Sequence, residues 1–468
     1  MAEATSCRVL ASSPADAPES RLRLGKISLN AALSDPLLDS TNFLNEIAGH
    51  YPDAISLAAG APHEAFFSDI DIPRYTHRFM AYLKADRKFS DAEVRRLLYQ
   101  YGPSRGQINE IVADVLRNDE GIDVPPEAIV ITAGCQEALL IAFLVLCRDR
   151  SDLIAVPTPC YTGALGAARL LGREVIGIDS TADGIDLEQL ARACDVARAA
   201  GARIRMLYIS PDFANPSGVT LGLAERRRLL AEAERQDLLI VEDSPYGFTR
   251  RPGTELPALK SMDHWGRVLY VGSFAKACMP GARVGYVVAD QIVVNAQDAD
   301  QFLAAELATA KSMTTLNTSA ISQAVIGGML LEHGCSLAAL AEGKARHYQR
   351  NMALLLDALH RHVGEAEAAV HEITWNAPGG GFFVRMTLPV AADRQLLDVS
   401  AREYGVIWTP MRHFYVNNEG ANELRLSCSN LNEETLEEGV LRLSRFLTDP
   451  RVRPPARPVA DRRLPEPS

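Results

Sequence analysis

Lys276 lies in a segment whose side chains suit an aldehyde cofactor that carries a phosphate group. Lysine forms a Schiff base with a carbonyl group, which makes Lys276 the candidate catalytic residue. Ser273 and Arg283, on either side of it, can bind a phosphate, the first through its hydroxyl and the second through a two-pronged charged hydrogen bond. Pyridoxal phosphate is an aldehyde of this kind. A solvated surface lysine beside a chance serine is the alternative for this segment taken alone.

Short runs of β-branched and aliphatic residues alternate with helical patterns along the middle of the chain. The runs at 129–132, 153–156, 206–209, 238–241 and 268–271 predict strands. Their alternation with helices indicates a mostly parallel sheet that is covered on both faces. Ligands bind at the carboxyl ends of the strands in such a sheet, and each candidate polar group directly follows one of these runs. The site is therefore expected to assemble from several loops.

Two strand ends carry groups that a pyridine ring with a phosphate requires. Gly134, Cys135 and Gln136 follow the first strand and open a helix, so their backbone N–H groups are expected to point at an anion. Asp243 follows the fourth strand. A carboxylate that faces the pyridine nitrogen keeps it protonated, which makes the ring an electron sink. A plain strand-to-helix turn and a capped turn are the alternatives for these two segments.

The order of motifs across residues 57–429 resembles the fold type I pyridoxal phosphate aminotransferases. The segment 215–218, Asn-Pro-Ser-Gly, is similar to the family's Asn-Pro-Thr-Gly element, with serine in place of threonine. Within the family, the chain looks like the branch of 2-aminoadipate, kynurenine and aromatic amino acid aminotransferases. The sequences around Asn215 and Gly134 are also similar to aminotransferases that make hydroxyphenylglycines for peptide antibiotics.

The resemblance implies further cofactor contacts. Tyr161 matches the tyrosine that stacks on the pyridine ring, and a core tyrosine is its alternative. Asn215 and Tyr246 match the two hydrogen-bond donors to the ring oxygen. Tyr101 matches the tyrosine that reaches the phosphate of the neighbouring subunit, so the resemblance implies a homodimer with shared sites.

A substrate carboxylate is usually held by a guanidinium group. Arg425 matches the family's carboxylate-binding arginine, and Gly60 and Asn215 match contacts on the same carboxylate; a surface arginine at a strand edge is the alternative. Two positions depart from the branch. Ala275 replaces a common serine, which removes one phosphate hydroxyl. Arg385 follows a position where relatives often have tryptophan, and it either alters side-chain specificity or points to solvent.

The composition limits the classes of function. The chain has 468 residues, of which 47% are hydrophobic and 23% charged, which suits one large domain and a smaller one. A net charge of −11, with no basic stripe and no long apolar stretch, argues against nucleic-acid and membrane partners. Eight cysteines without a Cys-x-x-Cys pair indicate buried thiols rather than disulfides or a metal site. No secretory signal pattern opens the chain, so we expect a cytoplasmic protein.

The resemblance and the patterns together predict a fold type I α/β architecture, with a large domain on a mostly parallel seven-stranded sheet and a small α+β domain. Helical patterns at 316–331 and 337–360 and strand patterns at 382–384, 406–408 and 424–427 belong to its second half. The expected boundaries are a disordered tail at 1–20, an N-terminal arm that covers the substrate with Phe43 at 21–70, the large cofactor-binding domain at 71–315, the small domain with linking helices at 316–448 and a disordered tail at 449–468.

The implied function is a ping-pong transamination between an L-amino acid, of the aromatic or arylglycine type, and a 2-oxo acid, with Lys276 moving the proton. The alternative is that the same scaffold catalyses decarboxylation, oxidation or ring formation on an amino acid, as part of secondary metabolism. No residue type in the sequence excludes these reactions. A cofactor-sensing regulator would need a winged-helix region before the domain, for which the N-terminus has no room. A nicotinamide dehydrogenase would need Gly-x-Gly-x-x-Gly after a strand, which is absent. The sequence does not name the donor or the acceptor.

Overall fold

The runs of valine, isoleucine and leucine between residues 129 and 288 form one large sheet with the strand order β2-β9-β8-β7-β6-β3-β4-β5. A computed structural model describes residues 22, 24–35, 38, 49–181, 184–251, 253–254, 256–294, 299–417 and 419–453. The strands are β2 (Ile129–Thr132), β3 (Asp152–Thr158), β4 (Val175–Thr181), β5 (Gly184–Ile185), β6 (Arg203–Ile209), β7 (Leu239–Ser244), β8 (Val268–Ser273) and β9 (Gly285–Val288).

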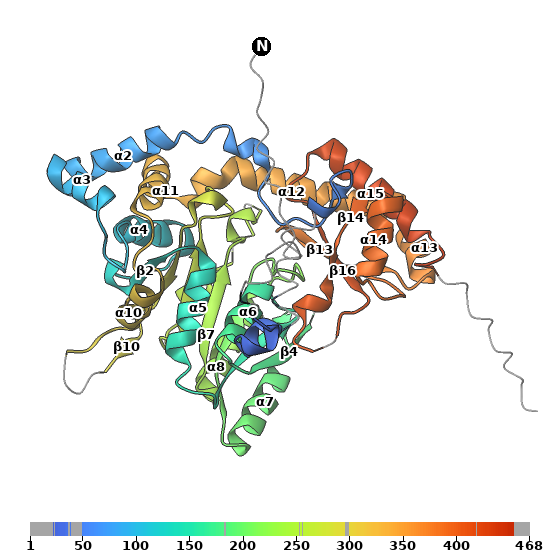
Figure 1. Cartoon of the computed structure of the whole chain (residues 1–468), viewed down its shortest axis with the longest axis horizontal. Coiled ribbons are helices and arrows are strands. Elements are labelled where there is room, and N and C mark those ends of the chain that lie inside the picture. The colour runs from blue at the N-terminus through green and yellow to red at the C-terminus, as the bar shows by residue number, and fades with distance from the viewer. Residues whose placement is uncertain are drawn as a thin grey trace, which may run out of the picture.

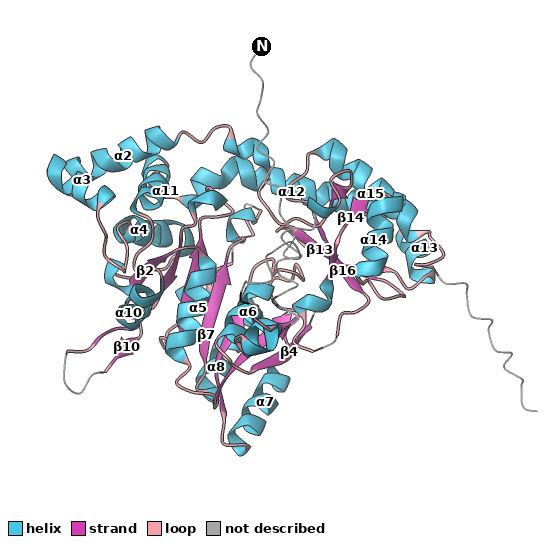
Figure 2. Ribbon diagram, viewed as in Figure 1, coloured by secondary structure: helices cyan, strands magenta, loops and turns pink. Residues whose placement is uncertain are grey.

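Strands β4, β3, β6, β7 and β8 are parallel neighbours, whereas β9 runs antiparallel to both β8 and β2. The predicted mostly parallel sheet is therefore confirmed, although it has eight strands among the described residues where we expected seven. The two-residue strand β5 extends its edge as an antiparallel partner of β4. In Figure 2 this sheet lies among the helices of the large domain.

Helices cover both faces of the sheet. Successive residues of a strand face opposite sides, and the strands carry buried apolar residues on both sides, so each face packs against helices. On β8, Tyr270 packs in the same apolar cluster as helices α4 and α11, whereas Leu269 and Val271 pack in the cluster of α5. The first face carries α2 (Ile72–Ala85), α3 (Asp91–Tyr99), α4 (Asn109–Glu120), α7 (Leu187–Ala199), α8 (Leu223–Gln236), α9 (Leu259–Met262) and α11 (Ala320–Glu332). The second face carries α5 (Cys135–Leu146), α6 (Thr162–Leu170) and α10 (Leu303–Thr314), and a small hairpin, β10 (Ile292–Val293) with β11 (Gln301–Phe302), precedes α10.

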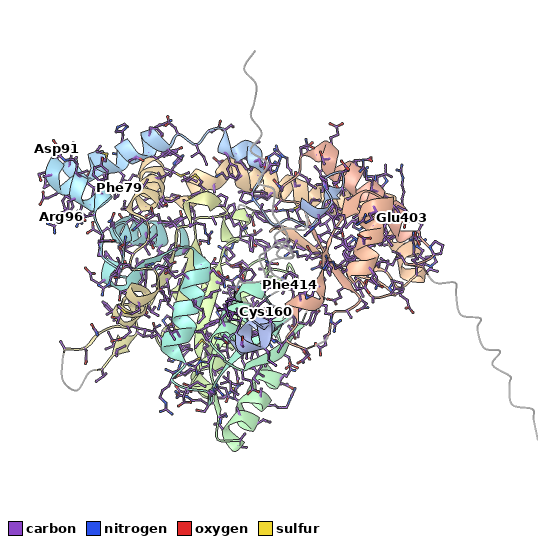
Figure 3. The ribbon with its side chains drawn as sticks, in the orientation of Figure 1. Phe79, Asp91, Arg96, Cys160, Glu403 and Phe414 are labelled. Atoms are coloured by element: carbon purple, nitrogen blue, oxygen red, sulfur yellow. The ribbon has the colours of Figure 1, made fainter. Side chains whose placement is uncertain are left out.

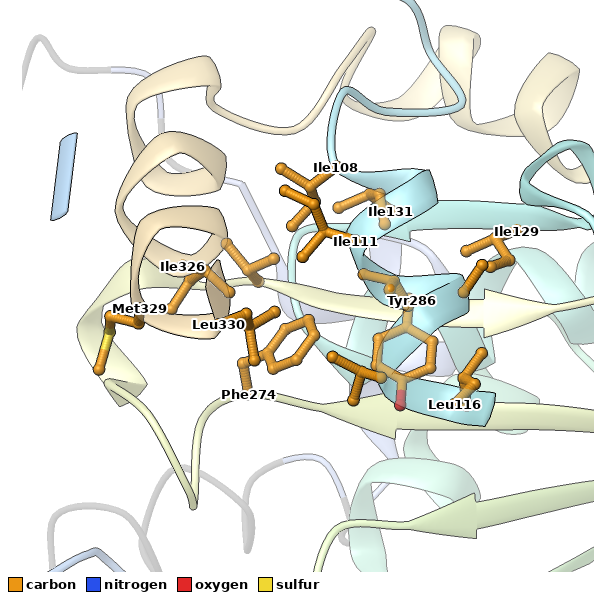
Figure 4. Close-up of a cluster of buried hydrophobic side chains, with 14 of the residues drawn as sticks. Ile108, Ile111, Leu116, Ile129, Ile131, Phe274, Tyr286, Ile326, Met329 and Leu330 are labelled. Atoms are coloured by element: carbon orange, nitrogen blue, oxygen red, sulfur yellow. The ribbon is translucent and has the colours of Figure 1, made fainter. Parts of the chain in front are cut away.

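Helix α11 belongs to the core of the large domain, although we expected the second domain and its linking helices to begin at 316. Its residues Ile326, Met329 and Leu330 pack with Phe274 and Tyr286 (Figure 4). The physical reason is close contact with α2, because a side chain at Gly328 would overlap the α2 backbone. This core also anchors the segment of Lys276, since Phe274 and Cys278 are both buried in it.

The smaller domain has its own sheet and core. Its sheet has the order β12-β13-β16-β15 and is antiparallel throughout, and the parallel pair β1 and β14 lies beside it. The elements are β1 (Ile55–Ser56), β12 (Thr374–Trp375), β13 (Phe383–Thr387), β14 (Val406–Ile407), β15 (Thr409–Pro410), β16 (Glu423–Ser427), α12 (Leu337–His362), α13 (Glu365–Val370), α14 (Arg394–Glu403) and α15 (Glu433–Leu447). The long helix α12 extends from the large domain into the small one (Figure 1).

The ends of the chain refine the expected boundaries. Leu57 of the N-terminal arm is fully buried in the core of the small domain. Val452 is also buried there and Asp449 is buried, so the packed part of the chain extends a few residues beyond the expected boundary at 449. Residues 1–20, the cover residue Phe43 and residues 454–468 lie outside the described residues. No single helix within the described ranges is long and apolar enough to span a membrane, while α11 and α12 would pass that test only as a pair bent by 88°.

Candidate active site

A cavity of about 390 Å³ lies where the two domains meet, at the carboxyl ends of β6, β7 and β8. The sequence-predicted residues that line it are Gly60, Cys135, Gln136, Tyr161, Asn215, Asp243, Tyr246, Ser273, Lys276, Arg283 and Arg425. Figure 3 labels two side chains at this boundary, Cys160 of the large domain and Phe414 of the small domain, and the backbone N–H of Cys160 donates to the carbonyl of Phe414 over 2.7 Å. Residues from both domains thus form one site.

The amine of Lys276 points into this cavity and donates a hydrogen bond to the carbonyl of Gly60 over 2.7 Å. Burial, with the positive charges of Arg425 and Arg283 adding to it, lowers its pKa from 10.5 to about 8. A much larger fraction of this amine is therefore neutral and nucleophilic near pH 8 than for an ordinary lysine. Lys344 of α12, which we did not predict, supports the segment by donating to the carbonyls of Ala277 and Cys278 over 2.5 and 3.0 Å.

One end of the cavity is built to receive an anion. Gly134 caps α5 with φ of +84°, and a side chain there would overlap the guanidinium of Arg283. Cys135 and Gln136 form the first turn of α5, whose free N–H groups attract negative charge. Ser273 lies beside them at the end of β8. The predicted phosphate ligands therefore converge at one place.

A buried ion pair behind this turn was not predicted. Lys311 of α10 donates to Glu137 of α5 over 2.6 Å, and both side chains are nearly excluded from solvent. The same Glu137 oxygen accepts from the backbone N–H of Ala133 over 2.6 Å, and its other oxygen accepts from Thr315 over 2.5 Å. Since Ala133 directly precedes Gly134, the pair fixes the backbone of the anion-binding turn.

Asp243 presents a carboxylate to the cavity from the end of β7. Its Oδ2 accepts a hydrogen bond from the hydroxyl of Tyr208 over 2.8 Å. Its Oδ1 is buried and has no hydrogen-bond partner among the described residues. Burial raises the pKa of this carboxyl to about 6, against the lowering effect of the Tyr208 hydrogen bond. A buried acceptor of this kind requires a donor, which a protonated ring nitrogen supplies.

Two aromatic side chains flank the ring position implied by the resemblance. Tyr161 lies at the start of α6, and burial raises its pKa to about 12, so it stays a neutral phenol. Tyr246 lies edge to face with Phe382 and Phe383, with ring centroids 5.1 and 5.8 Å apart, and burial also raises its pKa. Both rings line the cavity, so both are placed to contact a flat ligand.

Arg425 forms the opposite end of the cavity and is held by several neighbours. Its Nη1 donates to Asn215 over 2.6 Å, and its Nη2 donates to the carbonyl of Ala58 over 2.9 Å. The guanidinium lies over the rings of Phe383 and Phe414, at 4.1 and 5.1 Å from their centroids. Its buried Nε has no partner among the residues described. Within the described part of the chain, three of the five guanidinium N–H groups donate to Asn215, Ala58 and Thr409, so one N–H on Nη1 and the one on Nε remain as charged donors for a substrate carboxylate.

Phe383 and Phe414 are functional candidates that we did not predict from the sequence. The ring of Phe383 lies close to the backbone of Gly60, and a Cβ atom on that glycine would overlap the ring. Arg385, whose place was left open, does not line the cavity; its guanidinium lies 4.0 Å from Glu423. No signal in a single sequence separates such aromatic walls from core residues.

Tyr101 is not brought to this cavity. Its side chain is 83% exposed and lies in a separate surface depression with Tyr99 and Arg95. Its predicted contact across a dimer interface stays a prediction. Elsewhere in the described part of the chain, no group of three or more His, Cys, Asp or Glu residues is placed to hold a metal ion, and the described cysteines are free thiols.

The arrangement fits pyridoxal phosphate. The cavity holds an amine of lowered pKa, an anion-binding helix start and, at the far wall, a buried carboxylate oxygen that lacks a donor. These three groups correspond to the aldehyde, the phosphate and the ring nitrogen of that cofactor. Space and a free guanidinium donor remain beyond it for an amino acid.

Comparisons with known proteins point to one family of enzymes. The sequence profile described as "Aminotransferase class I and II" matches residues 74–443. The chain is 44% identical over 427 residues to an (S)-3,5-dihydroxyphenylglycine transaminase of Amycolatopsis orientalis, covering 91% of this chain and 95% of that protein. It is similar in structure to a kynurenine aminotransferase of Pyrococcus horikoshii, with a TM-score of 0.73, 26% identity and coverage of 91% and 96% of the two chains. An α-aminoadipate aminotransferase of Thermus thermophilus, solved with a phosphopyridoxyl-leucine, gives a TM-score of 0.70 with 27% identity over 90% and 98% of the chains.

Proposed function

The chain belongs to the aminotransferase class I and II family and is a pyridoxal phosphate-dependent aminotransferase, and from this we propose that its amino donor is an L-arylglycine, an amino acid whose aromatic ring is bonded directly to the α-carbon. One observation carries the choice of donor. The guanidinium of Arg425, which we assign to the substrate carboxylate, lies close to the rings of Phe383 and Phe414 at the cavity wall. A carboxylate held by the remaining N–H groups of Arg425 would bring the α-carbon, and a ring attached to it, against these aromatic walls. The relative that is 44% identical acts on such an amino acid by name.

The cofactor, when bound, withdraws electrons from the substrate α-carbon so that its proton can leave. Lys276 moves that proton. Its Nζ would accept the proton, because burial lowers its pKa to about 8 and so provides a neutral fraction near that pH, and would then return the proton as an acid. Asp243 would hold the ring nitrogen through its unpaired oxygen.

The other residues bind and orient. We assign the phosphate to Ser273, Arg283 and the backbone N–H groups of the first turn of α5. Tyr161 is assigned to the ring face. Asn215 is assigned to the ring oxygen together with Tyr246. Asn215 already accepts from Arg425, so it joins the cofactor end of the cavity to the carboxylate end.

The experiment is an absorbance scan of the cofactor-loaded protein while single amino acids are added without any oxo acid. An arylglycine such as 3,5-dihydroxyphenylglycine is expected to convert the cofactor fully to its aminated form, and an aryl glyoxylate to reverse it. The Phe414→Leu variant is expected to lose preference for arylglycine over alanine by about 10-fold, as loss of one aromatic contact implies. Conversion by alanine that equals conversion by arylglycine in the unaltered protein would refute the proposed donor.

We also propose that the protein is cytoplasmic and that it takes part in the biosynthesis of an antibiotic or another secondary product. We further propose that it forms a homodimer in which Tyr101 of each chain contacts the phosphate in the site of its partner. The high exposure of Tyr101 in a single chain supports a role at an interface. Mixed dimers of Lys276→Ala and Tyr101→Phe chains test it. If Tyr101 acts across the interface, each mixed dimer contains one unaltered site and regains activity. If it acts within its own chain, every site carries a defect and mixing restores nothing.

A further inference from the structure

Tyr208 and Asp243 form a buried pair on neighbouring strands of the large sheet. Tyr208 lies on β6 and Asp243 on β7, and the two side chains are joined by a 2.8 Å hydrogen bond from the phenol to Oδ2. The residues are 2% and 4% exposed. Both residues line the cavity in which we propose that the cofactor binds.

Apart from Tyr208, the described groups whose titration this carboxylate influences include thiols and phenols. Cys135, Cys160, Tyr161 and Tyr246 surround it from α5, from the loop between β3 and α6 and from the segment after β7. Burial raises the pKa of each of these thiols and phenols, so they carry no charge at neutral pH. Among the described groups, the Tyr208 hydroxyl is thus the hydrogen-bond donor that favours the ionised form of Asp243.

The two oxygens of the carboxylate have different roles. Oδ2 is occupied by Tyr208, whereas Oδ1 is buried without a partner. A carboxylate with one oxygen fixed cannot rotate freely, so the same hydrogen bond that stabilises the charge also sets the direction of the free oxygen. The hydrogen bond from Tyr208 thus acts on Asp243 as an outer hydrogen bond acts on a metal-binding histidine, whose ring orientation it fixes.

We propose that Tyr208 is a positioning residue that holds Asp243 ionised and directs its Oδ1 at the cofactor's ring nitrogen, so that the nitrogen stays protonated. The inference rests on the proposed use of this cavity and extends it to a residue that does not touch the reacting atoms. The protonated nitrogen is what allows the ring to accept electrons from the substrate. Tyr208 therefore acts on the reaction through Asp243.

The test is the Tyr208→Phe variant loaded with cofactor labelled with ¹⁵N in the ring. The ¹⁵N chemical shift reports directly whether the nitrogen carries a proton, without any turnover. We expect it to move from the protonated toward the unprotonated value, and kcat to fall about 10- to 100-fold, the change that loss of a hydrogen bond to a charged group produces. KM for the amino donor is expected to change little, because the Arg425 end is untouched.

Two controls separate this role from a structural one. Tyr270→Phe removes another buried tyrosine hydroxyl, on β8, and is expected to leave the ¹⁵N shift unchanged. A cofactor analogue with carbon in place of the ring nitrogen is expected to abolish the difference in kcat between Tyr208→Phe and the unaltered protein. Asp243→Asn marks the shift of a site without the carboxylate.

Each outcome decides the matter. A ¹⁵N shift in Tyr208→Phe equal to that of the unaltered protein overturns the proposal, as does an undiminished kcat effect with the carbon analogue. If the shift moves as expected in a protein that fails to convert arylglycines, the proposed donor fails and the role of Tyr208 stands. If Asp243→Asn itself leaves the shift unchanged, Asp243 does not face the nitrogen and the proposal for Tyr208 falls with it.

Discussion

The lowered pKa of Lys276 leads to a measurable prediction for the cofactor-free protein. Burial and the charges of Arg425 and Arg283 bring its pKa from 10.5 to about 8. At about 1.4 kcal/mol per pH unit, this difference corresponds to about 3 kcal/mol in favour of the neutral amine. At pH 8 about half of the Lys276 amines are then neutral, compared with about 0.3% for an ordinary lysine side chain. We expect the amine to be on the order of 100-fold more available as a nucleophile at this pH.

The same shift makes stability depend on pH with a definite sign. Between pH 8 and 10.5 the folded protein holds the neutral amine while the unfolded chain holds the ammonium ion, so unfolding takes up a proton. The free energy of unfolding therefore rises with pH across that window. Below pH 8 the folded protein bears the full destabilising effect of burying the charged amine. The Lys276→Met variant is expected to lack this rise when its unfolding is compared with that of the unaltered cofactor-free protein.

Competitive acetylation with trace acetic anhydride, read by mass spectrometry of peptides, measures the pKa of Lys276 directly. The cofactor-free protein is labelled from pH 6 to 11 with N-acetyl-lysine amide as an internal standard. We expect a midpoint near pH 8 for the Lys276 peptide. The Arg425→Met variant is expected to raise that midpoint, because it removes a positive neighbour. A midpoint at the value of the standard in the unaltered protein would refute the reasoning from burial.

Three further predictions concern stability and cofactor affinity. Lys311→Met leaves the buried carboxylate of Glu137 without its positive partner, so we expect the free energy of unfolding by denaturant to fall by about 3–5 kcal/mol. Arg346→Met, which removes an exposed ion pair, is the control and is expected to lower it by under about 1 kcal/mol. Equal losses in the two variants would contradict the role of burial. Gly134→Ala places a side chain against a guanidinium at φ of +84° and is expected to weaken cofactor affinity at least about 10-fold in a fluorescence titration, while unaltered affinity would argue against this anion site. Gly328→Ala is expected to lower the unfolding free energy by about 1–3 kcal/mol because it separates α11 from α2, and an unchanged melting temperature would show that the helices move apart freely.

The sheet and the first layer of the site could be predicted because both leave local signals in the sequence. Runs of β-branched residues predicted β2, β3, β6, β7 and β8, and these strands lie where we expected them, apart from extended ends. The polar residues that follow them converge because parallel strands end at the same edge of the sheet. The positions of Asp243 and Lys276 just after strands were therefore enough to predict that the two residues line one cavity.

Contacts between distant segments could not be predicted in this way. Helix α11 packs in the large domain because its small residue Gly328 permits close approach to α2, which periodicity does not reveal. Val452 fills the core of the small domain from a segment whose composition resembles a tail. Lys311 and Glu137 are separated by 174 positions in the chain, and each taken alone looks like a surface charge of a helix.

The second layer of the site occupies part of the hydrogen-bonding capacity of Asp243 and Arg425 and leaves the rest free. Tyr208 occupies one oxygen of Asp243 and leaves the other buried and unpaired, and Asn215, Ala58 and Thr409 accept from the two terminal nitrogens of Arg425 and leave Nε without a partner among the described residues. A buried polar atom without a partner costs free energy, so these two atoms, on residues that line one cavity, destabilise the cofactor-free protein. The cost is recovered when ligands supply the missing partners, and donors fixed beforehand need no reorganisation during reaction. Residue types identify Asp243 and Arg425 in a sequence, but only the neighbours that occupy their other atoms determine which oxygen and which nitrogen face the ligand.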